Sequence, residues 1–325
     1  MINKPLENKC FILDEMSINK RGIKTFIKRM LYYPLSFIYK CILFLYRPKK
    51  QDKKYKVSIC SIFKNEGLYL KEWIEYHLIV GVEHFYLYNN NSDDNYLEIL
   101  KPYIDSGVVT LTDWEFTPGQ MKAFADCADK HKNDTEWIAY IDLDEFIVPK
   151  KDYYVYDFLR HFKNRPFVLA YWKIFASGGL KARKSDYVIE DFVISPRKLT
   201  SIGKCFYNTK YNYSPELKEN STMHLMSSKV CGIEIPPINS FGKFVIYNIN
   251  KGKNKETIQI NHYLTKSIDE YLYKKSKRGG GVHVTGFHTM GYFLEHNYMC
   301  DSVDYSTYRY LPHLKLKVDY KLKDE

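Results

Sequence analysis

The chain has 325 residues, and 45% of them are hydrophobic, so the sequence can build a large core and is not that of a disordered protein. The net charge is +11, but the excess of Lys and Arg falls within residues 20–54 and the rest of the sequence is nearly balanced, which argues against nucleic-acid binding by the rest of the chain. The seven cysteines form no C-x-x-C pair, which argues against a zinc ribbon and indicates a reducing compartment.

The first distinctive segment is apolar and spans residues 30–46. It contains Pro34 and Lys40 and is shorter than the roughly 20 residues that cross a bilayer as a helix. Two interpretations stay open: an amphipathic helix on an anionic membrane surface, or a helix docked on the protein's own core. The sequence shows no secretory signal peptide, so we expect a cytoplasmic protein, peripheral at the inner face of the cell membrane.

Residues 47–54 have the composition of a basic linker and complete an N-terminal arm over residues 1–54. Beyond it, β-branched apolar runs alternate with segments of helical periodicity. This alternation is typical of an α/β fold with a mostly parallel, Rossmann-like sheet and helices on both faces. Strands are predicted at 57–63, 84–88, 108–112 and from 137 onward, and helices from Leu70 to Gly81, from the polar turn 89–94 to Leu100, and over 120–131.

The pattern weakens after Pro149. We place the main domain at residues 55–290 and treat residues 291–325 as a C-terminal extension. Within this part, residues 167–175 and 186–194 are predicted strands, residues 195–260 are loop-rich, and a helix is predicted over 267–277, before a run of three glycines.

Polar clusters follow three of the predicted strands. They are Asn65 with Glu66, the run from Asn90 to Asp94 that includes Asp93, and the run from Asp142 to Glu145. Ligands of open α/β sheets bind beyond the carboxyl ends of the strands. The three clusters are therefore expected to form one site.

Asp142 and Asp144 frame Leu143 at the end of the apolar run that begins at Trp137. Residues i and i+2 of a strand share a side, and two carboxylates this close repel each other unless a cation lies between them. Mn²⁺ or Mg²⁺ takes oxygen ligands and bridges to a diphosphate. The sequence therefore predicts a metal-diphosphate site, with helix or turn capping by the two aspartates as the alternative.

The residues around this pair resemble glycosyltransferase family 92. The resemblance spans roughly residues 57–280. It is carried by FKNEGLYLKEWIEYHLIVGVEHFYLYNNNSDD, Gln120, Asp126-Cys127, WIAYIDLDEF, WKIFASG, VIEDF, Met223-His224 and NHYLTKSIDEYLYKKSKRG. It implies a GT-A fold, a nucleotide-sugar donor, usually Mn²⁺, and an inverting reaction.

Carried over by position, the resemblance assigns Asp142 and Asp144 to the metal. It implies a further metal ligand at His224 or His262, and we favour His262 because a helix follows it. Asn65, Glu66, Asn90 and Asp93 match the loops that hold the nucleoside.

An inverting transfer needs one general base for the acceptor hydroxyl. We favour Glu190, with Glu145 and Asp191 as the other candidates. Lys266, Lys274 and Arg278 are candidates to clamp the diphosphate. The alternative is a solvated basic face, and it suits Lys274 better than Arg278.

Two departures from the family pattern concern the segment GKCFYNTK (203–210) and the short N-terminal apolar segment. The first leaves acceptor recognition open, and the second suggests a bacterial, peripheral enzyme. We therefore predict metal-dependent transfer of a sugar, with galactose as the candidate, from a UDP donor to a glycan or lipid-linked glycan in surface polysaccharide or lipopolysaccharide synthesis. The rivals are a metal-dependent nucleotidyl- or phosphotransferase and a non-enzymatic membrane-surface or nucleic-acid binder acting through residues 20–54.

Overall fold

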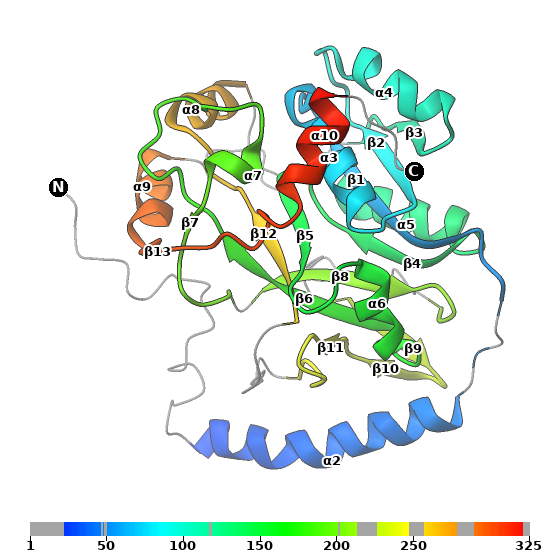
Figure 1. Cartoon of the computed structure of the whole chain (residues 1–325). Helices are drawn as coiled ribbons and strands as arrows, with labels where there is room; N and C mark the ends of the chain where they lie inside the picture. The colour runs from blue at the N-terminus through cyan, green and yellow to red at the C-terminus, as the bar shows by residue number, and fades with distance from the viewer. Residues whose placement is uncertain are drawn as a thin grey trace.

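A computed structural model shows a mixed α/β chain with a curved, largely parallel central sheet and flanking helices (Figure 1). The predicted α/β class is confirmed. The structure describes residues 23–46, 48, 51–116, 119–200, 202–212, 226–246, 257–277 and 289–320.

The first half of the sheet follows the predicted alternation. Its four strands pair in parallel in the order β3-β2-β1-β4, and a helix lies between each strand and the next along the chain. The strands are β1 (Tyr55–Phe63), β2 (His84–Asn89), β3 (Val109–Asp113) and β4 (Thr135–Tyr140), and the helices are α3 (Gly67–Ile79), α4 (Tyr96–Asp105) and α5 (Gln120–His131).

Helices cover both faces of this half. Side chains alternate across a strand, so Ile59 and Cys60 of β1 point to opposite faces. Ile59 shares one core with Trp73 of α3, and Cys60 shares a second core with Phe124 of α5. The predicted placement of helices on both faces is therefore confirmed.

The second half of the sheet mixes directions. β8 runs antiparallel to β4 and β6, β12 runs parallel to β6, and β5 runs antiparallel to β12. Two small two-stranded sheets pair β9 with β10 and β7 with β13. The bounds are β5 (Glu145–Pro149), β6 (Phe167–Ile174), β7 (Ile194–Ser195), β8 (Gly203–Asn208), β9 (Ser228–Val230), β10 (Ile233–Ile235), β11 (Ile238–Asn239, beside β6), β12 (Ile258–His262) and β13 (Ser302–Val303).

Two sequence predictions are wrong in this half. Of residues 186–194, only Ile194 lies in a strand, β7, because the Glu72 carboxylate accepts the backbone N–H groups of Val188 and Ile189 and holds a short helix, α7 (Val188–Asp191). The loop-rich prediction for residues 195–260 missed β8, which lies in the middle of the sheet with all its residues buried.

The C-terminal helices pack onto the main body. Tyr310, Leu311 and Leu314 belong to the same core as α3, so residues after 291 contribute to the central packing. The predicted domain boundaries themselves stay predictions. The remaining helices are α6 (Val155–Leu159), η1 (Arg160–Phe162), α8 (Ile268–Lys277), α9 (Met290–Tyr298) and α10 (Leu311–Asp319).

Helix α2 (Ile23–Leu45) contains the apolar N-terminal segment and lies along one edge of the molecule (Figure 1). One side packs on a small separate core, where Leu43 is buried and the Tyr39 ring meets Phe244 with centroids 5.4 Å apart. This side of α2 therefore docks on the protein, as one of the two interpretations of residues 30–46 expected. Among the described residues, no helix combines the length and hydropathy needed to cross a bilayer.

Candidate active site

The sheet topology assembles a buried acidic group. β4 ends at Tyr140, the chain turns through Asp142 and Asp144, and β5 begins at Glu145. Because β5 and β12 are antiparallel, the first residue of β5 lies opposite the last residue of β12, and this pairs Glu145 with His262. The strand predicted from residue 137 onward therefore ends at Tyr140, and the acidic turn separates it from β5.

Asp144, Glu145 and His262 form a compact, buried set of ligand atoms. One atom from each residue lies within 4.8 Å of the others. His262 Nε2 is 3.5 Å from Asp144 Oδ1, and His262 Nδ1 is 4.0 Å from Glu145 Oε1. The His262 ring also packs on Trp172 of β6. Two carboxylates and an imidazole form a donor set that suits Mn²⁺.

Two atoms of this group are buried and have no hydrogen-bond partner among the described residues. They are Glu145 Oε1 and His262 Nδ1. Burying such an atom costs free energy unless it is satisfied, so their position side by side favours a bound cation. Burial raises the pKa of Glu145 well above its usual value, an effect that nearby Lys204 only partly opposes. A cation at this position would reverse that shift.

Asp142 has different partners from Asp144. Its Oδ1 accepts a hydrogen bond from Gln120 Nε2 at 2.6 Å, and its Oδ2 accepts one from Lys204 Nζ at 2.7 Å. The predicted pair Asp142 and Asp144 thus lies in one turn, but only Asp144 belongs to the compact three-residue group. The assignment of Asp142 to the metal stays a prediction.

Two lysines supply positive charge to these carboxylates. Lys204 is 1% exposed and also lies 3.6 Å from Glu145, because β8 runs antiparallel to β4 and its early residues meet the end of β4. Lys274 of α8 donates to Asp144 Oδ2 at 3.1 Å. Burial alone would raise the pKa of Asp144, but Lys274 and His262 outweigh it and hold that pKa well below its usual range.

Lys266 connects the acidic group to the loop after β1. It follows β12 with a φ of 49°, is buried, and places Nζ 4.0 Å from the centre of the Tyr69 ring. Burial, and then the charge of Lys274, lowers the pKa of Lys266, while Glu66 and Asp144 oppose this shift. Lys266 therefore lies within electrostatic reach of both polar clusters.

The loops after β1 and β2 bind each other. Asn65 Oδ1 accepts the backbone N–H of Asp93 at 2.9 Å, and the Gly67 N–H donates to Asp94 at 2.7 Å. Asn90 donates its amide to the backbone oxygens of Trp114 and Phe116 after β3. The clusters after β1 and β2 therefore meet as expected, and these side chains fix the loops.

The three candidate bases lie in two places. Glu145 is inside the acidic group, whereas Glu190 and Asp191 lie on α7. Glu190 Oε1 pairs with Lys315 at 2.6 Å, and Asp191 accepts the backbone N–H groups of residues 184 and 185. Within the described part of the chain, neither α7 carboxylate forms a hydrogen bond or ion pair with residues 142–145.

Several residues of the candidate site were not predicted from the sequence. Gln120 and Lys204 had no predicted role, although a lone Lys inside the strand-like run GKCFYN is a signal for a buried cation. Lys274 contacts Asp144 rather than solvent alone. Two predicted residues, His224 and Arg278, lie outside the described residues.

Comparisons with known proteins give the chain a family. The sequence pattern of glycosyltransferase family 92 matches residues 53–278. A family 92 protein of Oryza sativa subsp. japonica is 32% identical over 123 residues, 37% of this chain and 21% of the relative. The Arabidopsis thaliana protein named galactan beta-1,4-galactosyltransferase GALS3 is 33% identical over 122 residues, 33% of this chain and 24% of the relative.

A solved structure of Staphylococcus aureus TarS 1–349 in complex with UDP aligns with a TM-score of 0.34 and 16% identity, covering 51% of this chain and 52% of that one. The matches to the Oryza sativa and Arabidopsis thaliana relatives span about a quarter or less of those proteins' own lengths. The family pattern, by contrast, covers more than half of this chain and includes every described residue of the acidic group. By this match, the chain belongs to glycosyltransferase family 92.

Proposed function

We propose that this protein transfers a sugar from a UDP-sugar donor to a hydroxyl group of a glycan, with Mn²⁺ or Mg²⁺ as cofactor and inversion at the sugar carbon. The observation that carries the proposal is the buried group of Asp144, Glu145 and His262 beyond the ends of β4 and β12, in which two polar atoms form no hydrogen bond to the described part of the chain. Membership of family 92 supports the reaction class.

In this proposal, Asp144, Glu145 and His262 hold the metal, with Asp142 and His224 as further predicted ligands. The bound ion supplies positive charge for the leaving diphosphate. Lys274 contacts Asp144 and lies within electrostatic reach of Lys266, and both lysines are suited to bind phosphate oxygens, as we also expect of Arg278. Lys204 keeps the Asp142 carboxylate in place.

The nucleoside end of the donor is assigned to the loops after β1 and β2. Asn65 and Asp93 are joined by a hydrogen bond, and the buried Glu66 lies within electrostatic reach of Lys266. Asn90 positions the loop after β3. This arrangement would hold the base and ribose beside the diphosphate, with the three loops acting as one rim.

Glu190 is our proposed general base, and its contacts support that choice over the other two candidates. Asp191 already accepts two backbone N–H groups, and Glu145 is fully buried. Among the described residues, Glu190 Oε2 has no hydrogen-bond partner, while Oε1 accepts a hydrogen bond from Lys315. A carboxylate oxygen that accepts no other hydrogen bond is what removal of the acceptor proton needs.

Galactose is the proposed sugar, because one relative is named a galactosyltransferase. The proposed acceptor is a glycan or lipid-linked glycan of surface polysaccharide or lipopolysaccharide synthesis. We place the reaction at the cytoplasmic face of the cell membrane. The basic and apolar character of residues 20–54 supports that location.

A thermal-shift titration tests the donor assignment. The full chain is heated with UDP-galactose, UDP-glucose or UDP-N-acetylglucosamine, each with and without Mn²⁺. Binding to the folded state raises the melting temperature by mass action, so at least one UDP-sugar should do so, and more strongly with Mn²⁺. The absence of a shift with every UDP-sugar in the presence of Mn²⁺ contradicts the proposal.

A further inference from the structure

Helix α2 exposes an apolar face opposite the side that docks on the protein. Met30, Phe37 and Phe44 are spaced by seven residues, two helical turns, and therefore line up on one side of the helix. Their exposed fractions are 61%, 68% and 68%. Ile23, Phe26 and Leu45 are also more than 60% exposed. We call these six residues the outer face of α2.

The outer face differs from an ordinary solvent-facing helix surface. A surface helix normally carries charged and polar residues away from the core. Among the exposed α2 residues whose side chains are described, only Lys28 and Lys40 are charged. A contiguous exposed apolar strip of this kind marks an interaction surface.

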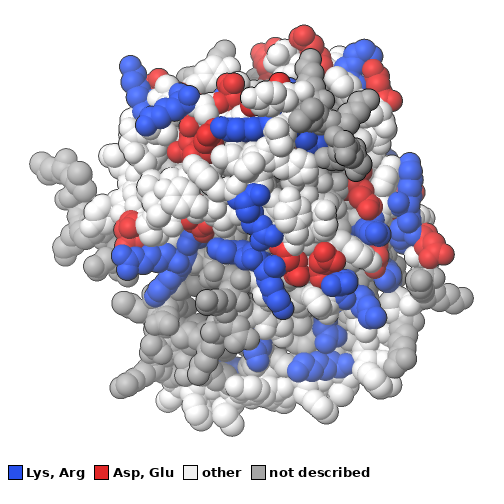
Figure 2. Space-filling view, viewed as in Figure 1, with Lys and Arg blue, Asp and Glu red and all other residues white. Residues whose placement is uncertain are grey.

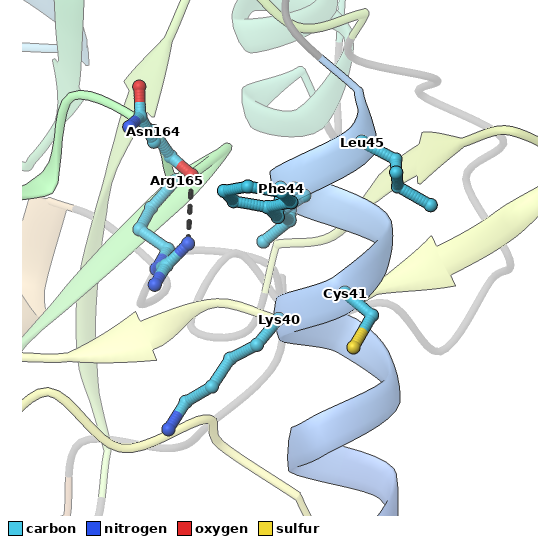
Figure 3. A pocket seen from close by; sticks show the side chains of 7 residues that line it. Lys40, Cys41, Phe44, Leu45, Asn164 and Arg165 are labelled. Atoms are coloured by element: carbon cyan, nitrogen blue, oxygen red, sulfur yellow. Dashed lines mark hydrogen bonds between the residues drawn. The ribbon is translucent and has the colours of Figure 1, made fainter.

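Cations lie at the edge of the strip. A pocket between α2 and the chain before β6 is lined by Lys40, Phe44, Arg165 and their neighbours. Figure 3 shows the Lys40 and Arg165 side chains on the same side of the helix, with the Phe44 ring beside them. Arg165 is half-buried, and one of its guanidinium N–H groups donates to the Asn164 carbonyl. The pocket thus combines two positive charges with an apolar wall.

The charges near α2 on the face in view have the same sign. In Figure 2, the described residues along the strip where Figure 1 places α2 are largely white, and the charged residues next to them are blue. An apolar strip with a cationic border is complementary to a bilayer that carries anionic headgroups. In a symmetric dimer through the same face, the two apolar strips would meet, and the cationic border would gain no opposite charge from its own copy.

We propose that the outer face of α2 lies in the interface of an anionic phospholipid bilayer, with Lys40 and Arg165 binding lipid phosphate. The inference rests on the proposed function in one respect, the glycan acceptor that membrane binding would bring near the site. Because the inner side of α2 stays packed on the protein, the bilayer also orients the body. Figure 1 shows α8, whose Lys274 contacts Asp144, at the end of the molecule away from α2. The acidic site then faces a glycan that extends away from the lipid.

Vesicle co-sedimentation of the full chain tests this. The vesicles contain phosphatidylcholine alone or phosphatidylcholine with phosphatidylglycerol. Phe37→Ser and Phe44→Ser should each lower partitioning into the vesicles about tenfold, because each removes a phenyl group that the bilayer would bury. Lys40→Gln and Arg165→Gln should each lower it about fivefold, on the anionic vesicles only. The matched controls are Leu97→Ser, at an exposed apolar residue of α4, and Lys198→Gln, at an exposed cation; both should bind like wild type.

Three results would overturn the proposal. The first is that the Phe37→Ser and Phe44→Ser variants bind vesicles as well as wild type does. The second is that wild type binds neutral and anionic vesicles equally. The third is that wild type binds no vesicles but dimerises with increasing concentration, and that the two variants do not dimerise. Thermal shifts with UDP-galactose and Mn²⁺ should be the same for the α2 variants and wild type. If no protein binds a UDP-sugar but vesicle binding follows the predicted order, the proposed function fails and this inference stands.

Discussion

Asp144 has the most specific set of contacts in the site. It lies 3.5 Å from His262, receives a hydrogen bond from Lys274, and shares the compact group with Glu145. We expect Asp144→Asn to weaken Mn²⁺ binding at least about 100-fold, because even residues that only support a metal ligand contribute 10- to 100-fold. Titration of Mn²⁺ by calorimetry measures this. Asp105→Asn, at an exposed residue of α4, is the control, and equal Mn²⁺ affinity of the two variants would contradict the assignment.

Lys204 gives a second prediction, because it is a buried cation between two carboxylates. Removing one partner of a buried ion pair leaves an uncompensated charge and costs about 3 kcal/mol. Lys204→Met should therefore lower the free energy of unfolding of the metal-free protein by about that amount, measured in urea. Saturating Mn²⁺ should recover part of the loss, since the ion supplies the missing positive charge. An equal loss with and without Mn²⁺ argues against a cation site here, and Lys101→Met on α4 controls for the loss of a surface charge.

The local sequence indicates the two aspartates but not Lys204. Asp142 and Asp144 follow an apolar strand, so alternation and charge repulsion were enough to single them out. Lys204 comes from a strand 60 residues later, and its contact with Asp142 depends on the antiparallel pairing of β8 with β4. Nothing in the local pattern around Lys204 encodes that pairing.

Helix α3 carries a pH-dependent contribution to stability. His77 is fully buried, donates from Nδ1 to the Trp73 carbonyl and accepts the Ile147 N–H at Nε2. Burial lowers the pKa of His77 to about 3, against an unfolded value of about 6.5. Because the folded pKa lies below the unfolded one, neutral His77 contributes to the free energy of unfolding above pH ~6.5. This contribution, as much as about 5 kcal/mol, is lost as the pH falls toward 3.

His77→Gln should keep hydrogen-bonding capacity without titrating. Its unfolding free energy should fall less steeply than that of wild type between pH 6.5 and 4, as measured by urea denaturation at several pH values. The difference between the two proteins isolates His77 from other groups. Parallel slopes would show that His77 does not titrate as its burial implies.

Strand β8 depends on a glycine next to the site lysine. A Cβ atom on Gly203 would lie 1.9 Å from the Ala170 carbonyl oxygen of β6, so the two strands would have to separate. We expect Gly203→Ala to destabilise the protein by about 3 kcal/mol or more, measured by chemical denaturation. Gly291→Ala is the control: its Cβ would meet only Thr289 Oγ1 at 3.4 Å, and it should be neutral or stabilising in helix α9. Similar losses for the two would contradict the close packing of β6 and β8.

At the scale of elements, the first half of the chain was predictable and the second was not. Strand–helix alternation up to β4 gives each segment a clear period, and α5 has the predicted bounds. Residues 188–191 form a short helix because Glu72, more than 100 residues away, accepts the backbone N–H groups of its first two residues. β8 was missed because it is only six residues long and lies among Ser, Gly and Asn residues that are typical of loops.

For the whole molecule, the uneven charge of the chain has a structural counterpart. The basic N-terminal region includes α2, which packs at the edge of the body rather than over the acidic site. The described part of the chain thus separates its apolar, cationic surface from its buried carboxylates. Docking on the protein accounts for one face of α2, and membrane binding stays a proposal for its exposed face.

The sequence by itself determined the α/β class, the parallel first half of the sheet and the acidic turn at residues 142–144, because these follow from local periodicity and from the carboxylate spacing. Only the tertiary structure decided which residues complete the site. His262 meets Glu145 through an antiparallel ladder, Lys204 arrives on β8, and Lys274 arrives on α8. Such contacts join segments far apart in the chain, and their geometry depends on strand order and direction, which no short pattern specifies.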